Sequence, residues 1–140
     1  THLPDCLTQI AAMLKQHSLV IFLTDLLPNS DGGGQPDEVI SSLARLRHGG
    51  HDVIVFHILD EAEVNFPYSG SVEFEDTESG QTITVDASEI RDEYLQDLDE
   101  FRQQYRNGCD RLRIDYVPLD TSMPFDKALT EYLIQRQNRF

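Results

Sequence analysis

Three aspartates each stand directly after one of the apolar segments that we predict to be long strands: Asp25, Asp60 and Asp120. In an open parallel sheet, ligands bind beyond the carboxyl ends of the strands, and carboxylate oxygens suit a hard cation such as Mg²⁺. The aspartates therefore predict one of two arrangements. Either they hold a metal ion for phosphoryl transfer or hydrolysis, or each caps the backbone that follows it, which is the commoner use of such a residue.

Other residue types that support catalysis are present without the spacing that catalysis needs. No spacing brings His48, His51 and His57 together as metal ligands, and we expect His57, inside a strand, to be a hydrogen-bonded core or interface histidine. The glycine-rich segment 31–35 lacks the lysine of a phosphate-binding loop, and the serines of 69–71 lack the strand-to-helix setting of a nucleophile. We therefore predict no catalytic residue and a protein that is not an enzyme, with the aspartate cluster as the alternative.

The composition fits one domain of 140 residues with a net charge of −14. Such a field repels nucleic acid, because phosphate binding needs clustered Lys and Arg, and it suits a basic protein partner or a cation. The two cysteines, Cys6 and Cys109, form no disulfide or zinc framework and are expected to be reduced core residues. No apolar run approaches the roughly 18 residues that span a membrane, so we expect a cytoplasmic protein without membrane contact.

Apolar runs alternate with segments of helical spacing, which predicts parallel strands joined by helices. The expected helices cover 4–16, 37–48, 86–112 and a last stretch from 122. The expected strands cover 18–25, 52–60 and 114–120, with an acidic-tipped hairpin at 71–74 and 81–85. The fold class is thus α/β, with three layers: a parallel sheet flanked by helices on both faces, plus a small antiparallel hairpin insertion, all in a single domain at residues 1–140.

Particular residues predict how these elements are placed. The strand at 19–23 is apolar at every position, which is typical of a strand in the middle of a sheet that helices cover on both sides. Pro118 inside the last strand predicts an edge position, and Ser122 is expected to cap the last helix. The expected buried face of that helix comprises Phe125, Leu129, Tyr132 and Leu133.

The strand sequences SLVIFLTD at 18–25 and HDVIVFHILD at 51–60 resemble the later strands of von Willebrand factor A-like domains. They are most similar to the bacterial family called domain of unknown function 58, whose members are often encoded beside MoxR-type AAA+ ATPases. The likeness continues through FED at 74–76, Gly80 and IDYVPLDTS at 114–122. It implies that the chain is the C-terminal half of such a domain, without the first three strands.

The same resemblance implies a metal site that this chain completes only in part. In such domains a divalent cation is held by an Asp-x-Ser-x-Ser motif, a threonine from a later loop and an aspartate after the fourth strand. Asp25 matches that aspartate, and Thr1 falls where the threonine is expected. The segment from Asp120 to Ser122 begins like the first motif but lacks its second serine. The resemblance thus implies no cofactor held by this chain alone, and Mg²⁺ in a complete domain.

These observations lead to an expected function. The resemblance implies a non-catalytic protein-interaction module that works with a MoxR-type AAA+ chaperone. The alternative is a metal-dependent phosphoryl-transfer or hydrolase domain that uses the three strand-terminal aspartates. An incomplete domain would also leave one edge of the strand at 19–23 unpaired, which predicts self-association as a homodimer.

Overall fold

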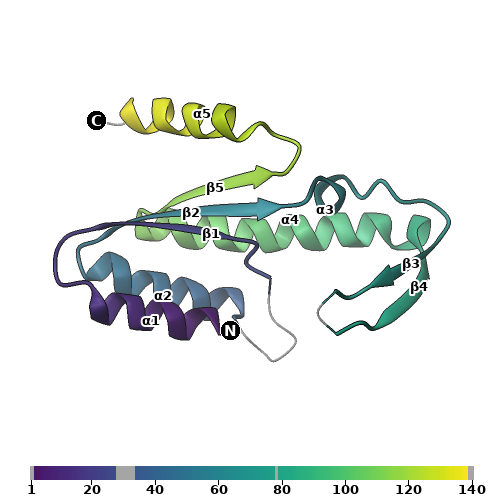
Figure 1. The fold of residues 1–140 in the computed structure, drawn as a ribbon, viewed down its shortest axis with the longest axis horizontal. Coiled ribbons are helices and arrows are strands. Elements are labelled where there is room, and N and C mark those ends of the chain that lie inside the picture. Colours follow the sequence, from purple (N-terminus) through teal and green to yellow (C-terminus); the bar gives the residue numbers. More distant parts are fainter. Residues whose placement is uncertain (1, 28–33, 78, 139–140) are drawn as a thin grey trace.

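The computed structural model describes residues 2–27, 34–77 and 79–138 (Figure 1). In chain order its elements are α1 (Leu3–Met13), β1 (Leu19–Thr24), α2 (Pro36–His48), β2 (Asp52–Leu59), α3 (Glu61–Asn65), β3 (Ser71–Glu75), β4 (Thr82–Asp86), α4 (Ala87–Leu112), β5 (Asp115–Asp120) and α5 (Phe125–Gln137). The predicted order of elements is confirmed, and the short helix α3 is an addition to it. Most of the predicted glycine-rich loop lies outside the described residues.

The long strands form a parallel sheet in the order β1–β2–β5. Leu19 pairs with Asp52, and Ile54 of the central strand pairs with Asp115. β2 is buried on both faces because helices cover it from both sides and a strand flanks each edge. The α/β class and the parallel sheet are therefore as predicted. Pro118 lies on an edge strand, where a missing N–H costs no sheet bond.

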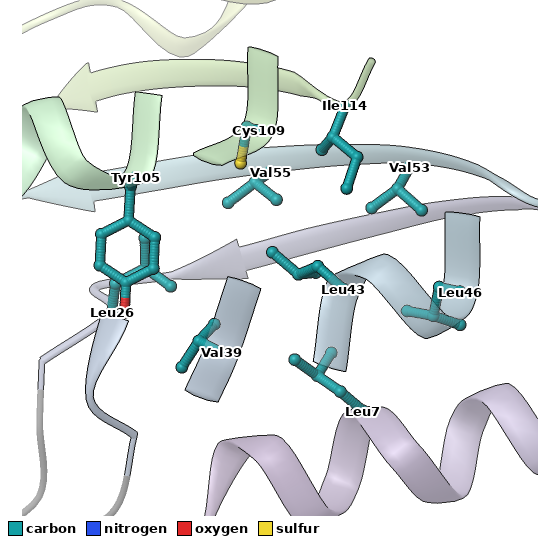
Figure 2. Close-up of a cluster of buried hydrophobic side chains, with 10 residues drawn as sticks. All are labelled: Leu7, Leu26, Val39, Leu43, Leu46, Val53, Val55, Tyr105, Cys109 and Ile114. Carbon is teal, nitrogen blue, oxygen red and sulfur yellow. The ribbon is translucent and has the colours of Figure 1, made fainter. Parts of the chain in front are cut away.

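Helices α1, α2 and α4 cover one face of the sheet and enclose the larger core (Figure 2). That core comprises Leu7, Leu26, Val39, Leu43, Leu46, Val53, Val55, Tyr105, Cys109 and Ile114. Gly108 lets α4 approach α2 closely, because a Cβ at that position would lie 2.4 Å from Cδ1 of Ile40. Both cysteines are free thiols, with Cys109 buried as expected and Cys6 partly so.

Within the described part of the chain, helix α5 alone covers the opposite face, where Tyr132 packs against Ile54 and Phe56. It covers β2 and β5 and leaves β1 bare. Three residues of β1 on this face are consequently exposed, with 53% for Leu19, 49% for Ile21 and 67% for Leu23. The prediction that β1 lies in the middle of the sheet with both faces buried is wrong. An apolar run predicts a strand but does not show which strands and helices lie beside it.

Two helix boundaries differ from the prediction. Helix α1 ends at Met13 instead of residue 16. Helix α5 begins at Phe125 with Pro124 at its N-cap, so Ser122 does not cap it. Ser122 instead hydrogen-bonds the side chain of Asp120.

The predicted buried face of α5 is correct in part. Tyr132 is buried and Leu129 packs beside it, whereas Phe125 is 72% and Leu133 is 53% exposed. Phe125 starts the helix, and Leu133 lies on its flank.

Strands β3 and β4 form the predicted hairpin as a separate two-stranded antiparallel sheet. It projects from the end of the molecule where α3 and the first turns of α4 lie (Figure 1). Phe66 anchors it through ring contacts with Tyr68, Phe74 and Tyr94, at centroid distances of 4.8–6.1 Å. Arg91 of α4 donates hydrogen bonds to the carbonyls of Asn65 and Phe66, which ties the end of α3 to α4.

Among the described residues, no helix combines the length and the apolar content that crossing a bilayer requires.

Candidate functional site

The side chains of the three strand-terminal aspartates accept hydrogen bonds from nearby backbone N–H groups. Oδ1 of Asp25 accepts from the Leu27 N–H at 3.2 Å, closing the turn after β1. Oδ1 of Asp120 accepts from the Ser122 N–H at 2.9 Å after β5. Such turns satisfy backbone donors that the end of a strand leaves unpaired. Each carboxylate therefore has a structural use that requires no ligand.

Asp60 caps the short helix α3 in a reciprocal arrangement. Its Oδ1 accepts from the Ala62 N–H at 2.8 Å, and Oε2 of Glu63 accepts from the N–H of Asp60 at 2.7 Å. This is a capping box. Thr121, just beyond β5, donates from its hydroxyl to Oδ2 of Asp60 at 3.2 Å. The acidic run after β2 is thus a capped helix.

The structure does not bring the predicted aspartates together as a metal centre. Within residues 2–27, 34–77 and 79–138, no group of three or more His, Cys, Asp or Glu side chains is placed to hold a metal ion. The three-aspartate site is therefore not formed, and capping is the arrangement found. Thr1, the second residue of the site implied by the resemblance, lies outside the described residues. His48 is exposed at the end of α2, apart from the buried His51 and His57.

His57 links the end of β1 to β5 through the middle of the sheet. Its side chain is fully buried. Nε2 lies 2.8 Å from the Asp25 carbonyl and Nδ1 lies 2.6 Å from the Tyr116 hydroxyl. Because a carbonyl only accepts, Nε2 carries the proton and Nδ1 accepts from Tyr116. The predicted hydrogen-bonded core histidine is thus confirmed, and it fixes the backbone of Asp25.

Burial keeps this region uncharged. Desolvation lowers the pKa of His57 to about 4, opposed by the hydrogen bond to the Asp25 carbonyl. The same cause raises the pKa of Tyr116, and it raises the pKa of the Cys109 thiol to about 12. A thiol held protonated is a poor nucleophile. None of these three side chains has the properties of an activated catalytic group.

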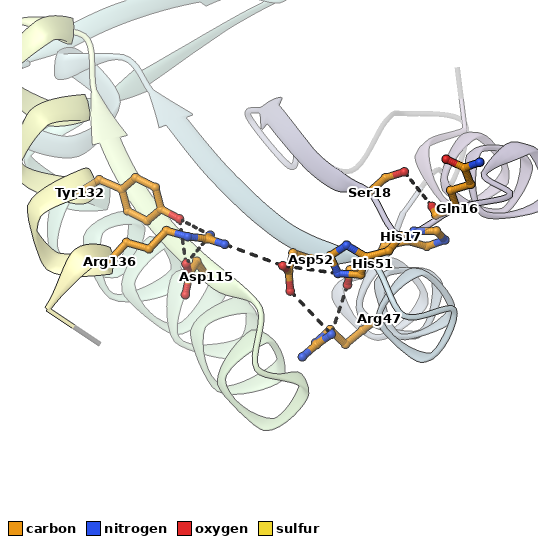
Figure 3. A network of polar contacts seen from close by, with 9 residues as sticks. All are labelled: Gln16, His17, Ser18, Arg47, His51, Asp52, Asp115, Tyr132 and Arg136. Atoms are coloured by element: carbon orange, nitrogen blue, oxygen red, sulfur yellow. Dashed lines mark hydrogen bonds and ion pairs between the residues drawn. The ribbon is translucent and has the colours of Figure 1, made fainter. Parts of the chain in front are cut away.

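A polar network at the opposite, amino end of the strands joins α5 to the sheet (Figure 3). The Tyr132 hydroxyl donates to Oδ2 of Asp115 at 2.7 Å, and Arg136 bonds the same carboxylate at 3.2 Å. Asp52 lies 4.0 Å from Arg136 and 3.8 Å from Arg47. These contacts position helices and leave no unbalanced charge.

Sequence reasoning missed this network, although two signals point to it. Tyr132 and Arg136 are four residues apart on one helix face, and Asp52 and Asp115 are the first residues of adjacent parallel strands. A groove of about 910 Å³ runs along β5 beside it, lined by residues that include Arg106, Arg113 and Asp110. Its lining balances four arginines against four acidic residues, so the groove favours neither sign of charge.

The net charge of the protein is concentrated in one stretch of the chain. Residues 60–100 hold 14 acidic side chains and one basic side chain, a net of −13, whereas all other residues hold 11 acidic and 10 basic ones, a net of −1. This stretch comprises α3, the hairpin and the first half of α4, and its hairpin projects beyond the carboxyl ends of the strands (Figure 1). We call residues 60–100 the acidic end. It is the strongest electrostatic feature of the molecule.

The fold and these contacts define an α/β protein with a three-stranded parallel sheet and a projecting acidic hairpin. The strand-terminal aspartates at the rim of its sheet, the rim aspartates, cap the backbone that follows them. The model of the family described as "Protein of unknown function DUF58" matches residues 1–104, so the chain belongs to that family. The matched segment includes β1, β2, the hairpin and most of α4. No curated protein and no solved structure matches the chain.

Proposed function

We propose that this chain is a non-catalytic protein-interaction module of the von Willebrand factor A-like kind that works in the cytoplasm with a MoxR-type AAA+ ATPase. The observation that carries the proposal is the acidic end, where −13 of the net −14 charges gather around a projecting hairpin. A field of one sign on a protruding element steers association with a surface of the opposite sign. The partner surface would therefore be rich in Lys and Arg.

The exposure of the hairpin supports a binding role. Glu73 and Glu75 of β3 lie opposite Thr84 and Thr82 of β4, and all four side chains are exposed. This face meets no helix or strand among the described residues, whereas Val72, Phe74 and Val85 on the other face are partly buried. The carboxylates of Glu73 and Glu75 are thus accessible to a partner and do not close a turn as the strand-terminal aspartates do.

Charge reversal tests the proposal. The full chain is titrated with a purified MoxR-type AAA+ ATPase, and the dissociation constant is compared with that of Glu73→Lys/Glu75→Lys. The two substitutions change the charge of the hairpin by four units. This should weaken binding on the order of tenfold and flatten its salt dependence. The matched control, Asp110→Lys/Glu131→Lys, changes the net charge equally outside the acidic end and should bind like the natural chain. Equal loss in both variants, or no binding by any of them, would contradict the proposal.

A metal titration separates this function from phosphoryl transfer or hydrolysis. Because each rim aspartate already accepts backbone hydrogen bonds, we expect no tight Mg²⁺ or Mn²⁺ site and no hydrolysis of phosphate esters. Micromolar metal binding that disappears in both Asp25→Ala and Asp120→Ala would favour the enzyme and reject the non-catalytic module.

A further inference from the structure

The projecting hairpin of β3 and β4 pairs with no third strand among the described residues (Figure 1). At its two ends, the N–H of Asp76 donates to the Gln81 carbonyl and the N–H of Ala87 donates to the Gly70 carbonyl. In this register, even-numbered residues of β3 and odd-numbered residues of β4 direct their backbone groups toward each other. The outward backbone groups belong on β3 to Ser71, Glu73 and Glu75, and on β4 to Thr82, Thr84 and Asp86.

The two outer edges of the hairpin differ in charge. Glu73 and Glu75 place two exposed carboxylates along the edge of β3, and charged side chains on an edge oppose the addition of a strand. β4 has Thr82 and Thr84 opposite these positions, and β-branched residues favour strands. The edge of β4 is therefore better suited to a further strand.

The apolar face of the hairpin is covered at β3 and open at β4. Phe74 of β3 is partly buried and contacts the rings of Phe66 and Tyr68. Ile83, which pairs with Phe74 across the hairpin, is 61% exposed. A third strand beside β4 would bring an apolar side chain next to Ile83, and two-stranded hairpins gain stability from such a strand. The exposed Ile83 thus lies on the same strand as the uncharged edge.

We propose that the basic partner adds an extended segment to the outer edge of β4, as the third strand of the hairpin's sheet. The backbone of this segment bonds the outward groups of Thr82 and Thr84. One of its apolar residues lies beside Ile83, and the residues before and after that one, on the face that Glu73 and Glu75 share, are Lys or Arg. This inference rests on the proposed function and names the element of the partner that the acidic end recognises.

Charge complementarity selects this occupant. Neighbouring strands lie about 4.8 Å apart, so a residue of the added strand lies about 10 Å from Glu73 or Glu75, across a threonine. The long side chains of Lys and Arg reach a carboxylate over that distance. A second copy of this chain would instead bring another acidic end of net charge −13 against the first, which repulsion opposes.

Proline substitution separates strand addition from general charge attraction. The full chain and its variants are titrated with the purified MoxR-type AAA+ ATPase. Thr84→Pro removes an outward N–H but no bond to β3, so it should weaken binding about tenfold, as expected for one lost hydrogen bond. Two controls should bind like the natural chain: Thr84→Val, which keeps the N–H, and Ser71→Pro, which loses an outward N–H on the edge of β3. Thermal unfolding checks that all three variants fold.

Amide hydrogen exchange of the natural chain gives a second measurement that needs no substitution. On binding, the amides of Thr82 and Thr84 should become protected, whereas those of Glu73 and Glu75 should not. Protection at the edge of β3 in place of β4 would overturn the inference.

The outcomes separate this inference from the proposed function. Equal binding by Thr84→Pro and Thr84→Val, together with weaker binding by Glu73→Lys/Glu75→Lys, would overturn strand addition alone. No binding by the natural chain, or a charge reversal without effect, would reject the proposed function and strand addition with it. A dimer of the natural chain in sedimentation equilibrium that Thr84→Pro abolishes would assign the edge to a second copy and overturn the basic strand.

Discussion

At the residue scale, His57 makes stability depend on pH. Its pKa is lowered to about 4 in the folded protein from 6.5 in an exposed side chain, so on acidification the unfolded chain takes up the proton first. Stability should therefore fall as the pH drops from 6.5 to 4, by about 3 kcal/mol, and this loss should level off below pH 4. Denaturant unfolding at several pH values measures it. His57→Gln should lack this slope, and an identical slope in the variant would reject the assignment.

The rim aspartates should differ in their contribution to folding. Asp60→Ala removes one side of a capping box and the acceptor for Thr121, so it should cost about 1 kcal/mol. Asp25→Ala removes one exposed turn bond and should change stability by less than about 0.5 kcal/mol. Thermal unfolding of the two variants side by side measures the difference, and equal losses would contradict it.

Single residues were predictable from sequence where a local rule governs them. Asp86 caps α4 by accepting a hydrogen bond from the Ser88 N–H. The start of a helix can be predicted in this way because it depends on a few adjacent residues. The partners of His57 were not predictable, since Tyr116 lies 59 residues further on and meets it only when β2 and β5 pair. The prediction that Ser122 caps the last helix was wrong for a related reason. Ser122 lies in the turn before Pro124, where its N–H donates to the Asp120 side chain, and the helix begins only at Phe125.

At the scale of elements, the crossing of α2 and α4 depends on Gly108. Gly108→Ala gains about 1 kcal/mol of helix propensity but forces Ile40 out of place, at a cost of about 1 to 3 kcal/mol. We expect a net loss of about 1 kcal/mol in denaturant unfolding. In the background of Ile40→Ala the same substitution should become stabilising, since the obstructing side chain is gone. A loss of the same size in both backgrounds would show that the crossing is not what Gly108 serves.

The elements themselves were largely predictable, and their surroundings were not. Apolar residues three or four positions apart predicted the full length of α4, because one side of this helix packs against the rest of the protein. The apolar run of β1 gave the strand but not its edge position, because coverage depends on where α5 docks. Phe125 and Leu133 have the spacing of a buried face yet lie at the start and on the flank of α5.

At the scale of the whole molecule, charge and hydrophobicity are separated in space. The acidic end holds −13 of the net charge, and the exposed apolar side chains of β1 lie on the near-neutral remainder. A basic partner that binds the acidic end, as we propose, would not need to contact these apolar side chains. The membership in the DUF58 family covers both regions, since its match includes β1 and the hairpin.

The length of α4 sets how the molecule comes apart. Its 26 residues extend about 39 Å, whereas the eight residues of β2 extend about 26 Å, so the sheet supports only part of the helix. The overhanging turns and the hairpin rest on one another, through the Phe66 rings and Arg91, and not on the main core. We expect this end of the molecule to form its own cooperative unit, which opens at a lower free energy than the core. Amide hydrogens of the hairpin should therefore exchange faster than those of β2, which lies in the larger core.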